Sequence, residues 1–239
     1  MRATTPRPVV RRIPRRRRSR PITQEIATQL EQEILWGRFG PRERLVEEDL
    51  CVRFGVSRTP IREVLRILEA KGLVTIRASR GAQVREISWK EIEDLYAVRV
   101  VLESLALELA AGHLGETSIQ AIGARLRAMR QAARRNDVRR YFDADNEFRA
   151  LIFGACGNEV LIDLLTSVER RVQKFRFALL SLPGRLQEAQ RHHEAVFYAL
   201  RRGDGKLAGE LRRSRIENSK ALLASLRPLQ WGTPPARSR

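Results

Sequence analysis

The segment GVSRTPIREVL, residues 55–65, constrains the fold of this chain more than any other segment. Gly55 can adopt the positive φ angle that a sharp turn between two helices requires, and Ser57 is a suitable N-cap for a following helix. Apolar residues then recur at helical spacing and form one stripe: Ile61, Val64, Leu65 and Leu68. Arg58 and Arg62 are four residues apart and share another face. The segment therefore predicts a tight turn followed by an amphipathic helix with an exposed basic face.

The flanking residues extend this segment to a helix–turn–helix with a two-stranded wing. Residues 46–54 predict a short helix that ends at Gly55, and Lys71-Gly72 ends the basic helix. Residues 73–77 and 82–84 predict two short strands, joined by a turn that contains Gly81. A helix–turn–helix with a basic hairpin is a winged helix, which indicates DNA binding.

Candidate DNA contacts lie at the start of the basic helix and at the hairpin turn. An arginine can form two hydrogen bonds with a guanine edge, while hydroxyl and backbone N–H groups contact phosphates. The predicted contacts are Ser57, Arg58, Thr59, Arg62, Arg66, Arg80 and Gly81. For the helix taken alone, the alternative is an ordinary amphipathic helix whose arginines are only solvated.

The motif GVSRTPIREVL, followed by LEAKGLV and RGAQV, resembles the DNA-binding domain of GntR-family transcriptional regulators. The resemblance covers about residues 22–87 and implies a winged helix-turn-helix that binds double-stranded operator DNA. Glu48 stands where relatives often have an arginine, a departure that affects one expected DNA contact.

The distribution of charge also points to a nucleic-acid partner. The 239 residues carry a formal net charge of +18, and the first twenty contain nine arginines and no acidic residue. We predict that residues 1–20 are a disordered basic arm that adds salt-sensitive affinity for DNA phosphates. The alternative is a solvated tail that only aids solubility.

A second, helical region follows the winged helix-turn-helix domain, which we assign to residues 21–87. Ser88 and Glu91 have the spacing of a capping box. Helical patterns then predict helices over residues 89–111, 117–134, 137–155, 158–181, 184–202 and 204–225. The predicted fold class is mostly α, with a small β wing and a C-terminal all-α bundle. We predict that residues 88–225 form the effector-binding and dimerisation domain and that residues 226–239 form a flexible tail.

This helical region is similar to the FCD effector domain of the FadR-type subfamily, and the likeness rests on LYAVR from Leu95, DNEF from Asp145, Gly157-Asn158 and HEAV from His193. In metal-binding FCD domains, one aspartate and three histidines hold the metal. The matching positions here are Asp145, Arg149, His193 and Arg215. A guanidinium group has no lone pair for a metal, and two remaining ligands are too few for a zinc site. We therefore predict no metal and no cofactor.

Arg99 belongs to the inward stripe of the predicted helix 89–111, where a charge needs a partner. We predict an effector pocket for a small organic acid or a phosphorylated metabolite, made by Arg99, Asp145, Arg149, His193 and Arg215. The alternative is structural: Arg99 pairs with Glu103, or Asp145 pairs with Arg149.

These features predict a ligand-responsive transcriptional repressor that binds a palindromic operator as a homodimer. The alternative is a basic architectural DNA- or RNA-binding protein without a specific effector. An enzyme is disfavoured because the chain has three histidines and no phosphate loop, nucleophile elbow or acid–base pair. The sequence contains no run of 18 apolar residues, so we predict no membrane-spanning helix and no membrane partner. Two widely spaced cysteines, Cys51 and Cys156, suit the reducing cytoplasm, where we expect the protein to act.

Overall fold

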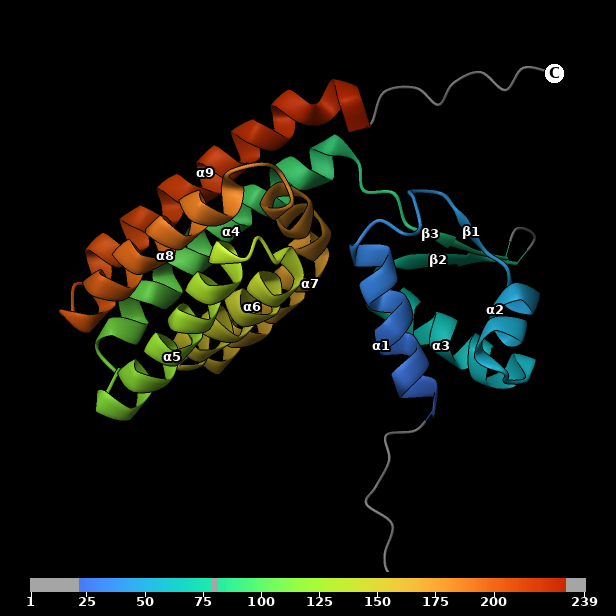
Figure 1. Cartoon of the computed structure of the whole chain (residues 1–239), viewed down its shortest axis with the longest axis horizontal. Coiled ribbons are helices and arrows are strands. Elements are labelled where there is room, and N and C mark those ends of the chain that lie inside the picture. Colours follow the sequence, from blue (N-terminus) through green and yellow to red (C-terminus); the bar gives the residue numbers. More distant parts are fainter. Residues whose placement is uncertain (1–21, 79–80, 231–239) are drawn as a thin grey trace, which may run out of the picture.

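The computed structural model describes residues 22–78 and 81–230, with the backbone alone for residues 227–230. The predicted arm, Arg80 and the last nine residues lie outside this part of the chain. Two units are visible in Figure 1, a small N-terminal unit of helices and strands and a larger bundle of helices. The N-terminal unit contains α1 (Ile22–Leu35), β1 (Arg44–Leu45), α2 (Glu47–Phe54), α3 (Arg58–Ala70), β2 (Val74–Arg77) and β3 (Gly81–Val84).

The N-terminal unit is a winged helix, as the sequence predicted. Gly55 ends α2 with φ 64°, the left-handed conformation that the turn into α3 requires. Strands β2 and β3 pair antiparallel, and β3 also pairs with β1, so the sheet order is β1-β3-β2. The sequence had not predicted β1, which is two residues long. The apolar stripe of α3 is buried against α1, and the core residues include Ile26, Leu30, Ile61, Val64, Leu65 and Leu68.

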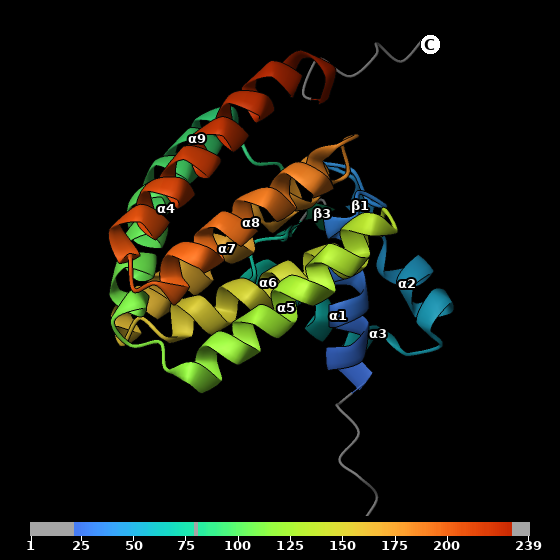
Figure 2. The same ribbon diagram turned by 60° about the vertical axis from the view of Figure 1, so that its left-hand side comes forward.

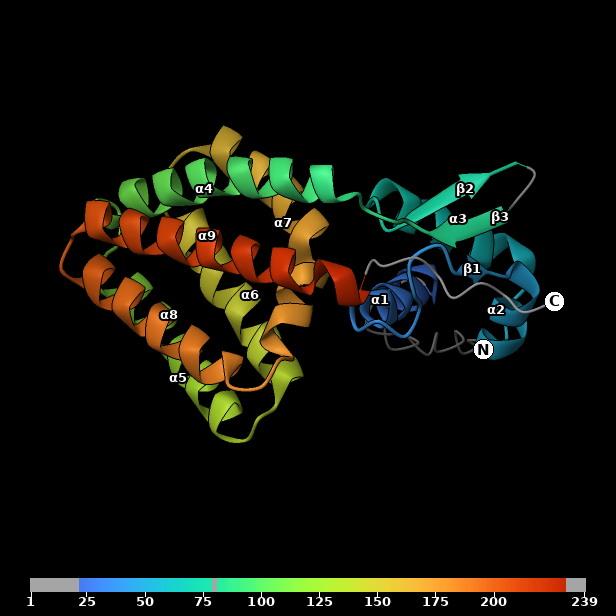
Figure 3. The same ribbon diagram turned by 90° about the horizontal axis from the view of Figure 1, so that it is seen from above.

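The second unit consists of α4 (Trp89–Ala111), α5 (Glu116–Arg134), α6 (Val138–Gly154), α7 (Glu159–Leu180), α8 (Arg185–Arg201) and α9 (Gly205–Gln230). Helix α4 lies along α9, α9 lies beside α8, and α5 packs on α6 and α8 (Figures 2 and 3). The Ser88 side chain accepts a hydrogen bond from the Glu91 backbone N–H at 3.2 Å and caps α4. Helix α9 continues to Gln230, so it includes residues 226–230, which the sequence had placed in the tail.

The two units touch where α1 meets α7 (Figure 1) and where Trp36, the residue after α1, meets α6 and α7. The indole of Trp36 lies 6.4 Å from the ring of Phe177 on α7, centroid to centroid. The guanidinium of Arg139 on α6 lies over the same indole, 3.9 Å from its centroid. An arginine over an aromatic face is attracted by the electron density of the ring, so this contact adds to the covalent connection at Ile87-Ser88. None of the described helices is long and apolar enough to cross a membrane.

Candidate DNA-binding face and effector cavity

The predicted DNA contacts gather on the solvent side of α3. The side chains of Arg58, Thr59, Arg62 and Arg66 are exposed there, and Gly81 is exposed at the start of β3. Ser57 occupies the N-cap position of α3, but its hydroxyl makes no capping hydrogen bond, contrary to the local pattern. The hydroxyl is therefore not used within the helix. This face can present two hydroxyl groups and three guanidinium groups to a duplex.

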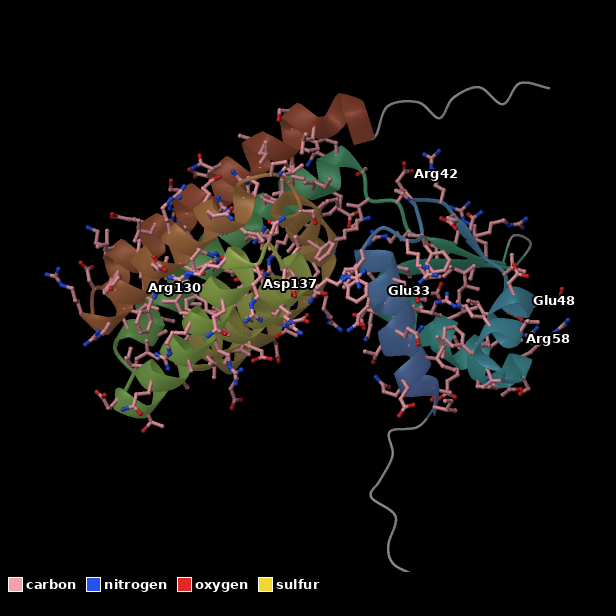
Figure 4. All side chains as sticks on the ribbon, in the orientation of Figure 1. Glu33, Arg42, Glu48, Arg58, Arg130 and Asp137 are labelled. Atoms are coloured by element: carbon pink, nitrogen blue, oxygen red, sulfur yellow. The ribbon has the colours of Figure 1, made fainter. Side chains whose placement is uncertain are left out.

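Acidic residues of α2 pair with the two leading arginines of this face. Arg58 pairs with Glu48, and Arg62 Nε donates a hydrogen bond to Glu47 Oε2 at 2.9 Å. Glu48 and Arg58 lie together at the outer edge of the N-terminal unit in Figure 4. The Arg58 and Glu48 side chains are 62% and 70% exposed, and ion pairs in water contribute little to stability. These arginines can thus exchange a carboxylate for a phosphate or a base at small cost.

All five residues predicted for the effector pocket line one cavity in the helical unit. Arg99 comes from α4, Asp145 and Arg149 from α6, His193 from α8 and Arg215 from α9. The cavity has a volume of about 50 Å³. Its wall includes further side chains that the sequence had not selected, among them Tyr96, Arg176 and Arg212. Side chains of five helices, α4 and α6 to α9, thus meet at one buried point.

Glu103 is the centre of one group of ion pairs. Its side chain is fully buried and accepts a hydrogen bond from Arg99 Nε at 2.8 Å. It also pairs with Arg212, and Arg149 Nη2 lies 3.1 Å from Glu103 Oε2. The structural alternative for Arg99, a pair with Glu103, is therefore present.

Asp145 is the centre of a second group of ion pairs, and its partner differs from the one in the structural alternative. Asp145 pairs with Arg176 of α7, not with Arg149, and His193 Nε2 lies 3.2 Å from Asp145 Oδ1. Arg176 also donates to Glu169 Oε2 at 2.7 Å, and Glu169 pairs with Arg149. The alternative pair of Asp145 with Arg149 is absent from the described ion pairs, because the Arg149 guanidinium meets Glu103 and Glu169 instead.

Three charged residues of this cluster were missed at the sequence level, although their spacing carries a signal. Glu169 follows buried Leu165 by four residues, and Arg176 follows buried Val172 by four. Arg212 precedes buried Ile216 by four. Each is a charged residue at a position where helical periodicity places a core residue.

The cluster has more guanidinium groups than carboxylates. The side chains of Arg99, Arg149, Arg176 and Arg212 share the carboxylates of Glu103, Asp145 and Glu169. Nearby, Arg215 and Arg185 share Glu188. Together, six guanidinium groups share four carboxylates, which leaves an excess of two positive charges among these described side chains.

Burial and neighbouring charges shift the titration of these groups. Burial raises the pKa of Glu103, but Arg149 and Arg99 outweigh it and lower that pKa to about 2. Burial also opposes ionisation of Asp145, yet Arg176 and His193 hold the pKa of its carboxyl below the ordinary value. Burial lowers the pKa of His193 to about 4, with Asp145 acting in the opposite direction. Glu103 and Asp145 are therefore ionised and His193 is neutral near pH 7.

The four positions matched in the sequence to a metal-binding set, Asp145, Arg149, His193 and Arg215, do not fit a metal ion in this chain. The Asp145 carboxylate is engaged by Arg176 and faces His193. Arg149 and Arg215 offer only donor N–H groups and permanent positive charge, which repels a dication. Within residues 22–78 and 81–230, no group of three or more His, Cys, Asp or Glu side chains is arranged to hold a metal.

Comparison with protein families matches both units. Residues 22–84 match the model described as "Bacterial regulatory proteins, gntR family", and residues 94–218 match the FCD domain. The second match alone covers more than half of the chain. This chain belongs to the GntR family of bacterial transcriptional regulators, with an FCD domain. The family likeness inferred from the motifs is thereby confirmed.

Individual relatives agree with this assignment. The chain is 27% identical over 187 residues to the HTH-type transcriptional repressor RspR of Escherichia coli K12, covering 78% of this chain and 82% of that protein. It is also 27% identical over 187 residues to a probable D-xylose utilization operon transcriptional repressor of Paenarthrobacter nicotinovorans, with the same coverage. The fold is that of E. coli McbR/YncC, with a TM-score of 0.73 at 20% identity over 86% of this chain and 98% of that chain.

Proposed function

We propose that this GntR-family regulator is a cytoplasmic repressor that binds a palindromic operator as a homodimer and is controlled by a small anion without a metal. The observation that carries the effector part is the buried cluster with more guanidinium groups than carboxylates. A buried charge without a partner is costly, so an anion that balances the excess is favoured. Repression is supported by two relatives named as repressors.

An exposed apolar face of α4 and α7 supports the dimer. Val98, Val101 and Leu105 of α4 and Val160 and Leu164 of α7 are between 40% and 71% exposed. The two helices are neighbours, and Arg171 of α7 pairs with Glu91 of α4. Exposed apolar side chains on two adjoining helices suit a second copy of the same chain, and a two-fold dimer reads two half-sites.

The dimer can be tested by placing charge on this face. Val101→Glu with Leu164→Glu should convert the protein to a monomer in sedimentation at micromolar concentration and weaken binding to a palindromic site. Tyr198→Glu, at another exposed position on α8, is the matched control. Wild-type protein that sediments as a monomer with and without DNA would contradict the proposal.

A chain of contacts between the two units supports control of DNA binding by the effector. Arg176, which pairs with Asp145, lies over the Phe142 ring at 5.2 Å from its centroid. Phe142 meets Phe177 edge-on at 5.4 Å, and Phe177 contacts Trp36 of the winged helix. A shift at Asp145 would therefore reach the winged helix directly as well as through Ile87-Ser88. Trp36→Ala should leave anion binding intact but reduce its effect on operator affinity; an unchanged effect would exclude this route.

The effector can be tested by calorimetry on chelator-treated protein with a panel of small carboxylates and inorganic phosphate. Binding should persist without metal, because guanidinium groups bind carboxylate and phosphate oxygens directly. Arg149→His combined with Arg215→His should make binding depend on added zinc. Stoichiometric zinc in the wild-type protein, or binding abolished by the chelator, would contradict the proposal.

A further inference from the structure

The cavity lined by the five predicted effector residues is too small for most organic acids. Its volume of about 50 Å³ holds a few water molecules. Pockets for drug-sized ligands occupy roughly 300–1,000 Å³, and a small organic acid needs less than that but more than this cavity offers. A second pocket of about 240 Å³ lies between α6 and α7. Arg149 lines both the small cavity and the larger pocket.

The larger pocket has one apolar end and one polar end. Because α6 and α7 are joined by a short turn, residues near that turn lie together, and they are Phe153, Gly154, Ile162 and Leu165. Farther from the turn the lining is polar: Asn146, Arg149, Glu169, Arg170 and Gln173. A ligand that fits this pocket has an apolar body and a polar or charged head.

Arg149 is a buried cation in the lining of this pocket. The residue is 4% exposed, yet its Nε and Nη2 groups lack a hydrogen-bond partner among the described residues. Nη2 lies within ion-pair distance of Glu103 and Glu169 but is not aligned for a hydrogen bond to either. The stem of Arg149 is held by Phe153, whose ring centroid lies 5.1 Å from the guanidinium carbon. Buried N–H groups without partners are costly, so a carboxylate that accepts from them is favoured.

Charge compensation allows a ligand carboxylate to replace Glu169 at Arg149. Glu169 would keep Arg176, which donates to its Oε2 at 2.7 Å, and Arg99, whose Nε lies 3.7 Å from its Oε1. One added negative charge would balance the four guanidinium groups that share three carboxylates. No charged group is left without a partner by this exchange.

We propose that the pocket between α6 and α7 binds a small carboxylic acid with an apolar ring or branched chain, whose carboxylate pairs with Arg149. The inference rests on the proposed function and narrows its effector class. An apolar body suits Phe153, Ile162 and Leu165, whereas a polyhydroxylated acid would lose hydrogen bonds to water at that end.

Gly154→Leu tests the pocket without altering a charged residue. Gly154 lines the pocket, and a Cβ there meets no atom within 4 Å, so the larger side chain is added at the rim of the pocket without a clash at Cβ. Ala124→Leu, at an exposed position of α5, adds the same side chain outside the pocket and is the matched control. Circular dichroism shows whether each variant is folded.

The probes are benzoate, phenylacetate and isovalerate, compared with gluconate and inorganic phosphate by calorimetry. At least one apolar acid should bind the wild-type protein, and Gly154→Leu should weaken it at least tenfold while Ala124→Leu does not. Apolar-acid binding that Gly154→Leu leaves unchanged, or no binding of any of the three acids, overturns this inference. If phosphate or gluconate then still binds and Arg215→Gln abolishes that binding, the proposed anion effector stands without this pocket. If no probe binds, the proposed anion effector fails as well.

Discussion

The arginines of α3 and those of the helical unit meet carboxylates in opposite surroundings. Arg58 and Arg62 pair with Glu48 and Glu47 on an open surface, where water and salt screen the attraction. In the helical unit, Arg99 pairs with Glu103 where both side chains are at most 4% exposed. An exposed arginine can replace its carboxylate partner by another anion with little loss of stability. A buried arginine keeps its carboxylate partner unless another charged group enters the core. Exposed pairs therefore suit DNA recognition and buried pairs suit a ligand-sensitive core.

The largest expected effect is the loss of stability when Glu103 is neutralised. Glu103→Gln leaves Arg99, Arg149 and Arg212 without their shared carboxylate and should lower the free energy of unfolding by about 3–5 kcal/mol. Denaturant unfolding measures the change. The exposed counterpart, Glu48→Gln, should change stability by less than about 0.5 kcal/mol. If Glu103→Gln and Glu48→Gln lowered the free energy of unfolding equally, the buried and the exposed ion pairs would not differ in their contribution to stability.

His193 should make stability depend on acidity. Its pKa is lowered by burial to about 4 in the folded chain, against 6.5 for the free side chain. The unfolded chain therefore binds the proton first, so stability is full above about pH 6.5 and falls as the pH approaches 4, by about 3 kcal/mol from this residue. His193→Gln should flatten the dependence of unfolding free energy on pH across that window. The same slope in both proteins would show that His193 is not kept neutral by its surroundings.

Arg58→Ala and Arg62→Ala should each weaken operator binding by about 1–3 kcal/mol and reduce the preference of the protein for the operator over random DNA. Fluorescence anisotropy with both DNAs measures the two affinities. Arg125→Ala is the control, because Arg125 forms a similar exposed pair with Glu147, 2.9 Å apart, on helices far from α3 in sequence. Equal losses on operator and random DNA would indicate contacts to phosphates only.

The smallest expected effect concerns Glu48, which holds Arg58 in the free protein and repels phosphates. Glu48→Gln should raise the affinity for random DNA by about 2–5-fold, equivalent to roughly 0.5–1 kcal/mol, and narrow the preference for the operator. The effect should shrink as salt rises, because both charges are exposed. Unchanged affinity for random DNA at low salt would show that Glu48 does not restrain Arg58.

The sequence by itself determined the parts of this protein that depend on local signals. Gly55 required a left-handed turn, the spacing of Ile61, Val64 and Leu65 required an amphipathic helix, and Ser88 marked the start of α4. Each signal acts within a few residues, so it is readable without knowing the fold. The five effector-pocket residues were selected partly from a family likeness and partly from an inward position on a helix, and they do line one cavity.

Only the tertiary structure decided which charges are partners. Arg212 and Glu103 are 109 residues apart, and Arg176 and Asp145 are 31 apart. Helical periodicity shows that such a side chain points inward, but the helix that faces it depends on how the helices pack. Strand β1 is likewise too short to leave a pattern and exists because β3 offers a free edge. The pocket between α6 and α7 was also invisible in the sequence, because its volume depends on how two helices are spaced.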